Sequence, residues 1–155
     1  MNRPAKKRPA AASDGVVRIE IDGAARGNPG PAGAGIVLKD PSGKILLEHS
    51  VYLGASTNNV AETCALILAL QEALKRSIRK VSVFSDSLLL TNQVGGSFRV
   101  KDERLQWLHA IIRNLLESFE QFEMKHLPRA QNRAADRLAN RAVDQGLKGQ
   151  ATFML

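Results

Sequence analysis

Residues 16–40 read VVRIEIDGAARGNPGPAGAGIVLKD, and the prediction of the fold begins from this stretch. Apolar and polar side chains alternate from Val17 to Asp22, which is the period of a strand with one buried face. The breaker sequence GNPG follows at residues 27–30, and a second apolar run starts at Ala34. The stretch therefore predicts two strands joined by a turn-rich link.

Patterns further along the chain extend this beginning. Residues 44–53, KILLEHSVYL, read as a third strand after the turn at residues 40–43, so three successive strands predict an antiparallel meander. The expected helices then span residues 57–74, 88–94, 102–119 and 132–143, and the expected strands span 81–85 and 119–126. We therefore expect an α/β fold. Its five-stranded mixed sheet combines the three-strand antiparallel meander with two parallel strands, added through right-handed crossovers and flanked by helices.

The length of 155 residues fits one domain. Residues 1–14 combine Pro, Ala, Lys and Arg without an apolar period, which predicts a disordered basic N-terminal tail. The folded domain is expected at residues 15–146, followed by a C-terminal extension at 147–155. The formal net charge of +7 favours a partner that carries phosphate. The tail fits either a weak contact with a nucleic-acid backbone or a solvated leader without a fixed role.

Cys64 is the only cysteine, which excludes an internal disulfide and a cysteine-cluster metal site. Because it lies in an apolar run, we expect a buried structural thiol. The sequence shows no apolar run of membrane-spanning length and no secretory signal, so we expect a cytoplasmic protein that does not enter a membrane. No coiled-coil period stands out, and we expect a monomer.

Four acidic residues stand at the ends or starts of separate expected elements. Asp22 ends the first strand, Glu62 lies in the first turn of a helix, Asp86 follows the strand at 81–85, and Asp136 belongs to the last helix. Each alone also fits a turn, a cap or a solvated side chain. Carboxylates that converge at a sheet edge, however, repel one another unless a cation neutralises them. Oxygen ligands without cysteine favour Mg²⁺ or Mn²⁺ over zinc, and two such ions about 3.5–4 Å apart promote phosphodiester hydrolysis.

Four segments together resemble the successive motifs of type 1 ribonuclease H. They are DGAARGNPGPAGAG from Asp22, TNNVAE from Thr57, SDS from Ser85 and HLPRAQNRAAD from His126. The resemblance covers about residues 16–146. It implies a ribonuclease H-like fold for the folded domain and an endonuclease that cuts the RNA strand of RNA–DNA hybrids.

The resemblance also implies roles for the four acids. Asp22 would bridge two Mg²⁺ ions, with Mn²⁺ a plausible substitute, and Glu62, Asp86 and Asp136 would complete the metal shells. Cleavage would leave a 5′-phosphate and a 3′-hydroxyl. Glu62 would also touch the ribose 2′-hydroxyl, the group by which RNA differs from DNA.

Substrate contacts are implied for the asparagines of the GNPG and TNN motifs. Asn28, Asn58 and Asn59 would reach the minor groove of the hybrid, and Gly23 would let the backbone approach it. Turn and cap roles are a physically adequate alternative for these residues. The chain lacks the extra basic helix and loop by which longer members grip the hybrid, so Arg99 and Lys101 are the candidate phosphate contacts that remain.

The segment HLPRAQN leaves two candidates open. His126 stands where many family members place a catalytic histidine that assists proton transfer. The segment is closer to the HxPR version of the loop, in which Arg129 would stabilise phosphate charge. Elsewhere, Leu88 replaces a polar glutamine of many relatives, and Trp107 is expected to pack in or near the core rather than to stack on a base.

Two other classes of function remain as alternatives. One is a non-catalytic module that binds a hybrid or duplex and has kept the fold. The other is a nuclease of the same fold that acts on double-stranded RNA or a junction. The four acids argue against a pure binding module, because such a module has no need of mutually repelling carboxylates beside a phosphate backbone.

Overall fold

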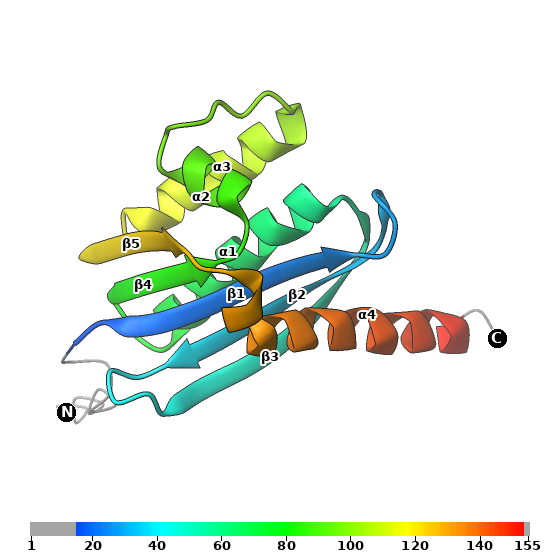
Figure 1. Ribbon diagram of the computed structural model, residues 1–155, viewed down its shortest axis with the longest axis horizontal. Coiled ribbons are helices and arrows are strands. Elements are labelled where there is room, and N and C mark those ends of the chain that lie inside the picture. Colours follow the sequence, from blue (N-terminus) through cyan, green and yellow to red (C-terminus); the bar gives the residue numbers. More distant parts are fainter. Residues whose placement is uncertain (1–14, 154–155) are drawn as a thin grey trace, which may run out of the picture.

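The computed structural model describes residues 15–153, and the predicted tail at 1–14 lies outside the described residues. Five strands and four α-helices follow one another in the described chain (Figure 1). They are β1 (Val17–Ala25), β2 (Gly30–Lys39), β3 (Ile45–Ser56), α1 (Asn58–Lys75), β4 (Lys80–Ser85), α2 (Leu88–Val94), α3 (Glu103–Leu116), β5 (Gln121–His126) and α4 (Arg133–Phe153), with a short 3-10 helix, Arg129–Gln131, before α4.

The strands form one mixed sheet in the order β3-β2-β1-β4-β5. β1, β2 and β3 pair antiparallel, whereas β4 pairs parallel with β1 and with β5. The predicted fold is therefore confirmed, including the three-strand meander and the two parallel strands. No helix in the described residues is both long enough and apolar enough to span a membrane.

The main core lies between the sheet and α1. Thr57 caps α1, because its side-chain oxygen accepts a hydrogen bond from the backbone N–H of Val60 at 3.2 Å. The helix then buries a nearly continuous row of Ala, Leu and Ile side chains against alternate residues of the sheet. The largest of the fully buried core residues include Ile19, Ile21, Ile36, Leu38, Leu66 and Leu70.

Helix α4 covers the opposite face of the sheet (Figure 1). Two glycines of β2 allow this close approach. A Cβ atom at Gly33 or Gly35 would collide with the backbone of α4 at Ala139 or Ala135. The glycines of the GPAGAG segment thus serve helix–sheet packing as well as the turn.

Helix α4 is longer than predicted. The sequence predicted a helix at residues 132–143, but α4 continues to Phe153, so residues 147–153 prolong the last helix of the domain. Gly146 was expected to mark the end of the domain, yet it lies within α4. A Cβ atom there would collide with the ring of Tyr52, so this glycine makes room for β3 rather than terminating the helix.

Two further side chains differ from expectation. The prediction that Trp107 packs in or near the core is wrong, since this residue is 61% exposed. α3 buries Leu105 and Ile112 towards α1, and Trp107 lies about 200° around the helix from Leu105. Cys64 is half-buried rather than fully buried.

Candidate active site

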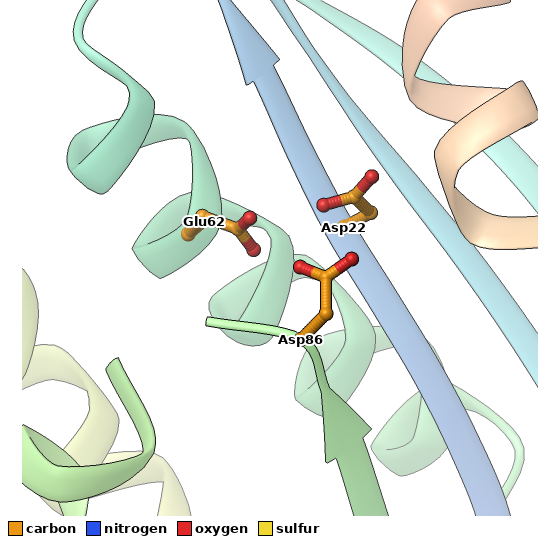
Figure 2. A group of neighbouring side chains, drawn as sticks. All are labelled: Asp22, Glu62 and Asp86. Carbon is orange, nitrogen blue, oxygen red and sulfur yellow. The ribbon is translucent and has the colours of Figure 1, made fainter. Parts of the chain in front are cut away.

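Three of the four predicted acids converge at one edge of the sheet. Asp22, Glu62 and Asp86 each offer a carboxylate oxygen, and these oxygens all lie within 4.8 Å of one another. Figure 2 shows the three side chains pointing towards a common centre from β1, α1 and the end of β4. We call these three residues the carboxylate cluster.

The register of two parallel strands places two members of the cluster side by side. Ile21 of β1 pairs with Ser85 of β4. The residues that follow them, Asp22 and Asp86, therefore lie next to each other. β4 ends at Ser85, and Asp86 therefore opens the crevice where parallel strands commonly bind ligands. β1 instead continues to Ala25, so Asp22 lies within the strand and not at its end as predicted.

Gly23 brings the third member, Glu62, into place. A Cβ atom at Gly23 would collide with the backbone of α1 at Ala61 and Glu62. Only a residue without a side chain lets the first turn of α1 rest directly on β1. The predicted substrate-binding glycine thus has a packing role in the structure, although it also lines the pocket described below.

Burial makes the carboxylate cluster unfavourable without a counter-charge. Asp22 and Glu62 are only 5% and 8% exposed. Burial raises the pKa of Asp22 to about 7, with the charges of Asp86 and Asp136 adding to the shift. Burial, followed by the charge of Asp22, raises the pKa of Glu62 to about 10. Oε2 of Glu62 is buried and has no hydrogen-bond partner in the described chain. Carboxylate oxygens that lie this close together, one of them without a hydrogen-bond partner, are suited to binding a divalent cation.

The fourth acid, Asp136, lies on α4 and lines the same pocket without belonging to the carboxylate cluster. Asn132 fastens the start of this helix to β1: its Nδ2 donates to the carbonyl oxygen of Ile21 at 2.8 Å. The backbone carbonyl of Asn132 accepts from the N–H of Asp136 at 3.1 Å. On the next turn, Nδ2 of Asn140 donates to the carbonyl of Asp136 at 3.0 Å. Asp136 therefore faces the cluster from the other face of the sheet.

The asparagines of the two loop motifs bind each other. Oδ1 of Asn28 accepts from the backbone N–H of Asn58 at 3.0 Å, and Oδ1 of Asn58 accepts from the N–H of Ala25 at 3.0 Å. Asn58 and Asn59 line the pocket, whereas Asn28 does not. Oδ1 of Asn59 is buried without a partner in the described chain. These bonds hold the loop after β1 against the start of α1.

The two candidates of the HLPRAQN segment are separated by the structure. Arg129 is exposed and lines the pocket. His126 is exposed at the end of β5, where its Nε2 lies 3.2 Å from the carbonyl oxygen of Asp86, and it does not line the pocket. Arg99 and Lys101 are exposed in the segment between α2 and α3 and also lie outside the lining.

The pocket has a volume of about 580 Å³ and includes three polar residues that the sequence did not mark as site residues, Arg26, Ser87 and Asn140. Nη1 of Arg26 lies 2.7 Å from a carboxylate oxygen of Asp144. The sequence holds a signal for this arrangement, because Asp136, Asn140 and Asp144 follow one another at the four-residue spacing of one helix face. The spacing alone does not show which residue contacts this face of the helix; in the structure it is Arg26.

A mixed sheet of this order, with a carboxylate cluster at the β1–β4 edge and helices on both faces, defines the class of ribonuclease H-like folds. The reverse transcriptase-like family model matches residues 20–142. Ribonuclease HI of Halobacterium salinarum is 41% identical over 130 residues, which cover 84% of this chain and 65% of that protein. The bifunctional protein Rv2228c of Mycobacterium tuberculosis is 40% identical over 136 residues, covering 87% of this chain and 37% of its own length.

Solved structures agree. The crystal structure of RNase H1 from Halobacterium salinarum superposes with a TM-score of 0.82 at 40% identity, covering 84% of this chain and 99% of that one. The structure of LC11-RNase H1 in complex with an RNA/DNA hybrid gives a TM-score of 0.81 at 40% identity, with coverage of 84% and 99%. The chain belongs to the type 1 ribonuclease H family.

Proposed function

We propose that this protein is an endonuclease that hydrolyses the RNA strand of RNA–DNA hybrids and leaves 5′-phosphate and 3′-hydroxyl ends. The observation that carries the proposal is the approach of Asp22, Glu62 and Asp86 to within 4.8 Å inside a pocket that Asp136 also lines. A relative solved in complex with an RNA/DNA hybrid, 40% identical to this chain, supports the choice of substrate.

The donor set suits two Mg²⁺ ions, and Mn²⁺ could replace them. Asp22, Glu62, Asp86 and Asp136 would hold the ions. When bound, the ions would supply the positive charge that activates a water molecule and stabilises the leaving oxygen. Burial of Asp22 and Glu62 supports this assignment, because an unpaired buried carboxylate is costly and a cation removes that cost.

The other pocket residues would position the substrate. Asn58 and Asn59 line the pocket at the start of α1 and would contact the minor groove of the hybrid, while Asn28 would hold Asn58 in place. Glu62 would read the ribose 2′-hydroxyl. Of the two candidates in the HxPR loop, Arg129 is better placed to hold phosphate charge, because it lines the pocket and His126 does not.

The remaining assignments form part of the same proposal. Residues 15–146 would constitute the catalytic domain and residues 1–14 a basic tail. Residues 147–155 would be a C-terminal extension, which through residue 153 continues α4. Arg99 and Lys101 would contact the hybrid outside the pocket. The protein would act as a monomer in the cytoplasm.

Cleavage of a labelled RNA–DNA hybrid tests the proposal, with double-stranded RNA and double-stranded DNA beside it and with Mg²⁺, Mn²⁺ or a chelator. The Asp86→Asn variant should lose activity, whereas Asp40→Asn, a matched change in the exposed β2–β3 turn, should keep it. Binding of the hybrid without cleavage in either metal would instead identify a binding module. Cleavage of double-stranded RNA in preference to the hybrid would identify a nuclease with another substrate.

A further inference from the structure

Arg26 connects the loop after β1 to α4. Its Nη1 lies 2.7 Å from Oδ1 of Asp144, and its Nη2 donates to the carbonyl oxygen of Asn140 at 3.3 Å. On its other side the same loop contacts α1, because Oδ1 of Asn28 accepts a hydrogen bond from the N–H of Asn58. The loop thus spans from α1 on one face of the sheet to α4 on the other, and Arg26 forms part of the pocket wall.

Stability does not account for this ion pair. The side chain of Arg26 is 43% exposed and that of Asp144 is 58% exposed. Such an exposed, solvent-screened pair contributes little to stability. The two contacts also use just two of the five N–H donors of the guanidinium, and the described chain supplies no hydrogen-bond partner for the other three. Asp144 itself does not line the pocket, so the pair holds the arginine beside the pocket while its acidic partner stays outside.

The charge of the pocket favours an anion at Arg26. Four carboxylates line it, and among the described residues the positively charged side chains in the lining are those of Arg26 and Arg129. A guanidinium binds phosphate through two parallel hydrogen bonds. A polynucleotide whose scissile phosphate lies at the carboxylate cluster brings further phosphates on both sides of it. Those phosphates need positive partners that the carboxylates cannot provide.

We propose that Arg26 binds a phosphate of the RNA strand adjacent to the one that is cleaved, and that Asp144 holds the guanidinium in position until this phosphate replaces it. The inference rests on the proposed function and adds a binding residue to it. Backbone contacts position a nucleic acid without reading its sequence. Loss of Arg26 should therefore weaken substrate binding and leave the chemical step nearly intact.

The test is steady-state cleavage of an RNA–DNA hybrid at several salt concentrations by the full chain and four variants. Arg26→Ala removes the donor, Arg26→Lys keeps the charge without the planar fork, and Asp144→Ala removes only the holding partner. Lys80→Ala is the matched control for lost charge. Lys80 starts β4 six residues before Asp86, about 20 Å away along the strand.

We expect Arg26→Ala to raise KM about tenfold, the size of one charge-assisted hydrogen bond, and to change kcat less than about twofold. The slope of log KM against log salt concentration should fall by about one. Arg26→Lys should show a smaller rise in KM. Asp144→Ala should leave KM unchanged or lower it, and Lys80→Ala should behave like the wild type.

Two results would overturn the inference. An unchanged KM and an unchanged salt slope in Arg26→Ala would show that Arg26 does not bind a phosphate of the substrate. An equal rise in KM in Arg26→Ala and Asp144→Ala, at the wild-type salt slope, would show that the pair only fastens the loop. If thermal melting shows that Arg26→Ala is unfolded, Arg26→Lys and Asp144→Ala decide between these roles. Failure of the wild type to cut the hybrid would be distinct, because it would refute the proposed function itself.

Discussion

Nδ2 of Asn132 donates a hydrogen bond to the carbonyl oxygen of Ile21 at 2.8 Å, across 111 residues of sequence. Ile21 immediately precedes Asp22, and Asn132 precedes Asp136 by one helical turn. This buried contact therefore links the part of β1 that carries Asp22 to the start of the helix that carries the fourth acid, Asp136. Asn132 itself is 1% exposed, so water does not compete for the bond.

Replacement of Asn132 by Ala should reduce the cleavage activity far more than it reduces the stability of the fold. Loss of the donor removes a buried hydrogen bond, worth about 0.5–1.5 kcal/mol, and frees the start of α4. We expect activity to fall about 10–100-fold, as for other residues that orient metal ligands. Hybrid cleavage and thermal melting measure the two effects, with Asn114→Ala on the exposed side of α3 as control. A lower melting temperature with full activity would show that Asn132 only fastens the start of α4 to β1.

Gly23→Ala should displace Glu62. The added methyl group would collide with the backbone of α1 at Ala61 and Glu62, and forced overpacking of this kind costs about 1–3 kcal/mol. We expect a lower free energy of unfolding in denaturant titration together with a loss of metal-dependent cleavage. Gly149→Ala, on α4 with open space around the glycine, is the matched control and should be neutral or stabilising. Equal behaviour of the two variants would contradict the packing role of Gly23.

Divalent cations should stabilise the protein through the carboxylate cluster. A ligand that binds only the folded state adds about 2.7 kcal/mol when its concentration is one hundred times Kd, and each kcal/mol raises Tm by about 2–4 °C in a chain of this size. We expect Tm to rise with Mg²⁺ in the wild type and to respond little in Glu62→Gln. In a chelator, Glu62→Gln should be as stable as the wild type or more so, because one buried carboxyl has been neutralised. An unchanged wild-type Tm at saturating Mg²⁺ would argue against the metal site.

His109 should make stability fall on acidification. It is buried on α3, and Nε2 has no hydrogen-bond partner in the described chain. Burial, followed by the charge of Arg113, lowers its pKa. Because the unfolded chain then binds the proton more readily, the contribution of His109 is complete above about pH 6.5 and is lost as pH falls through the folded-state pKa.

Denaturant titrations of the wild type and His109→Leu between pH 5 and pH 8 measure this contribution. We expect the variant to gain stability relative to the wild type as the pH decreases. A difference between the two proteins that stays constant over this range would show that His109 does not titrate on unfolding.

The sequence was sufficient for the elements and for most of the candidate site. Alternation from Val17 to Asp22 and the runs of Ala and Leu after Glu62 report which side of each element is buried, and that information is local. The four acids at 22, 62, 86 and 136 could be predicted to share one site, because the four motifs place each of them in a separate element of the fold. The motifs then identified the family, which the comparisons confirm.

Contacts between distant segments could not be predicted in this way. Trp107 is exposed because α3 packs on α1 through the side that carries Leu105 and Ile112, and Gly146 lies inside α4 because Tyr52 occupies the space beside it. The place of Arg26 in the pocket wall could not be predicted from its neighbours in the chain, because it depends on Asn140 and Asp144 of α4, which bind its guanidinium.

The sequence by itself determined the order of strands and helices, the family and the identity of the acids, since periodicity and motif spacing are properties of neighbouring residues. Only the three-dimensional structure shows which of these acids form a buried cluster and what holds Asp136 beside them. It also shows that the side chain of Arg26 forms part of the pocket wall. Burial, pKa and ion pairing depend on the faces that meet in space, and those faces belong to segments that are distant in the chain: Arg26 and Asp144 lie 118 residues apart.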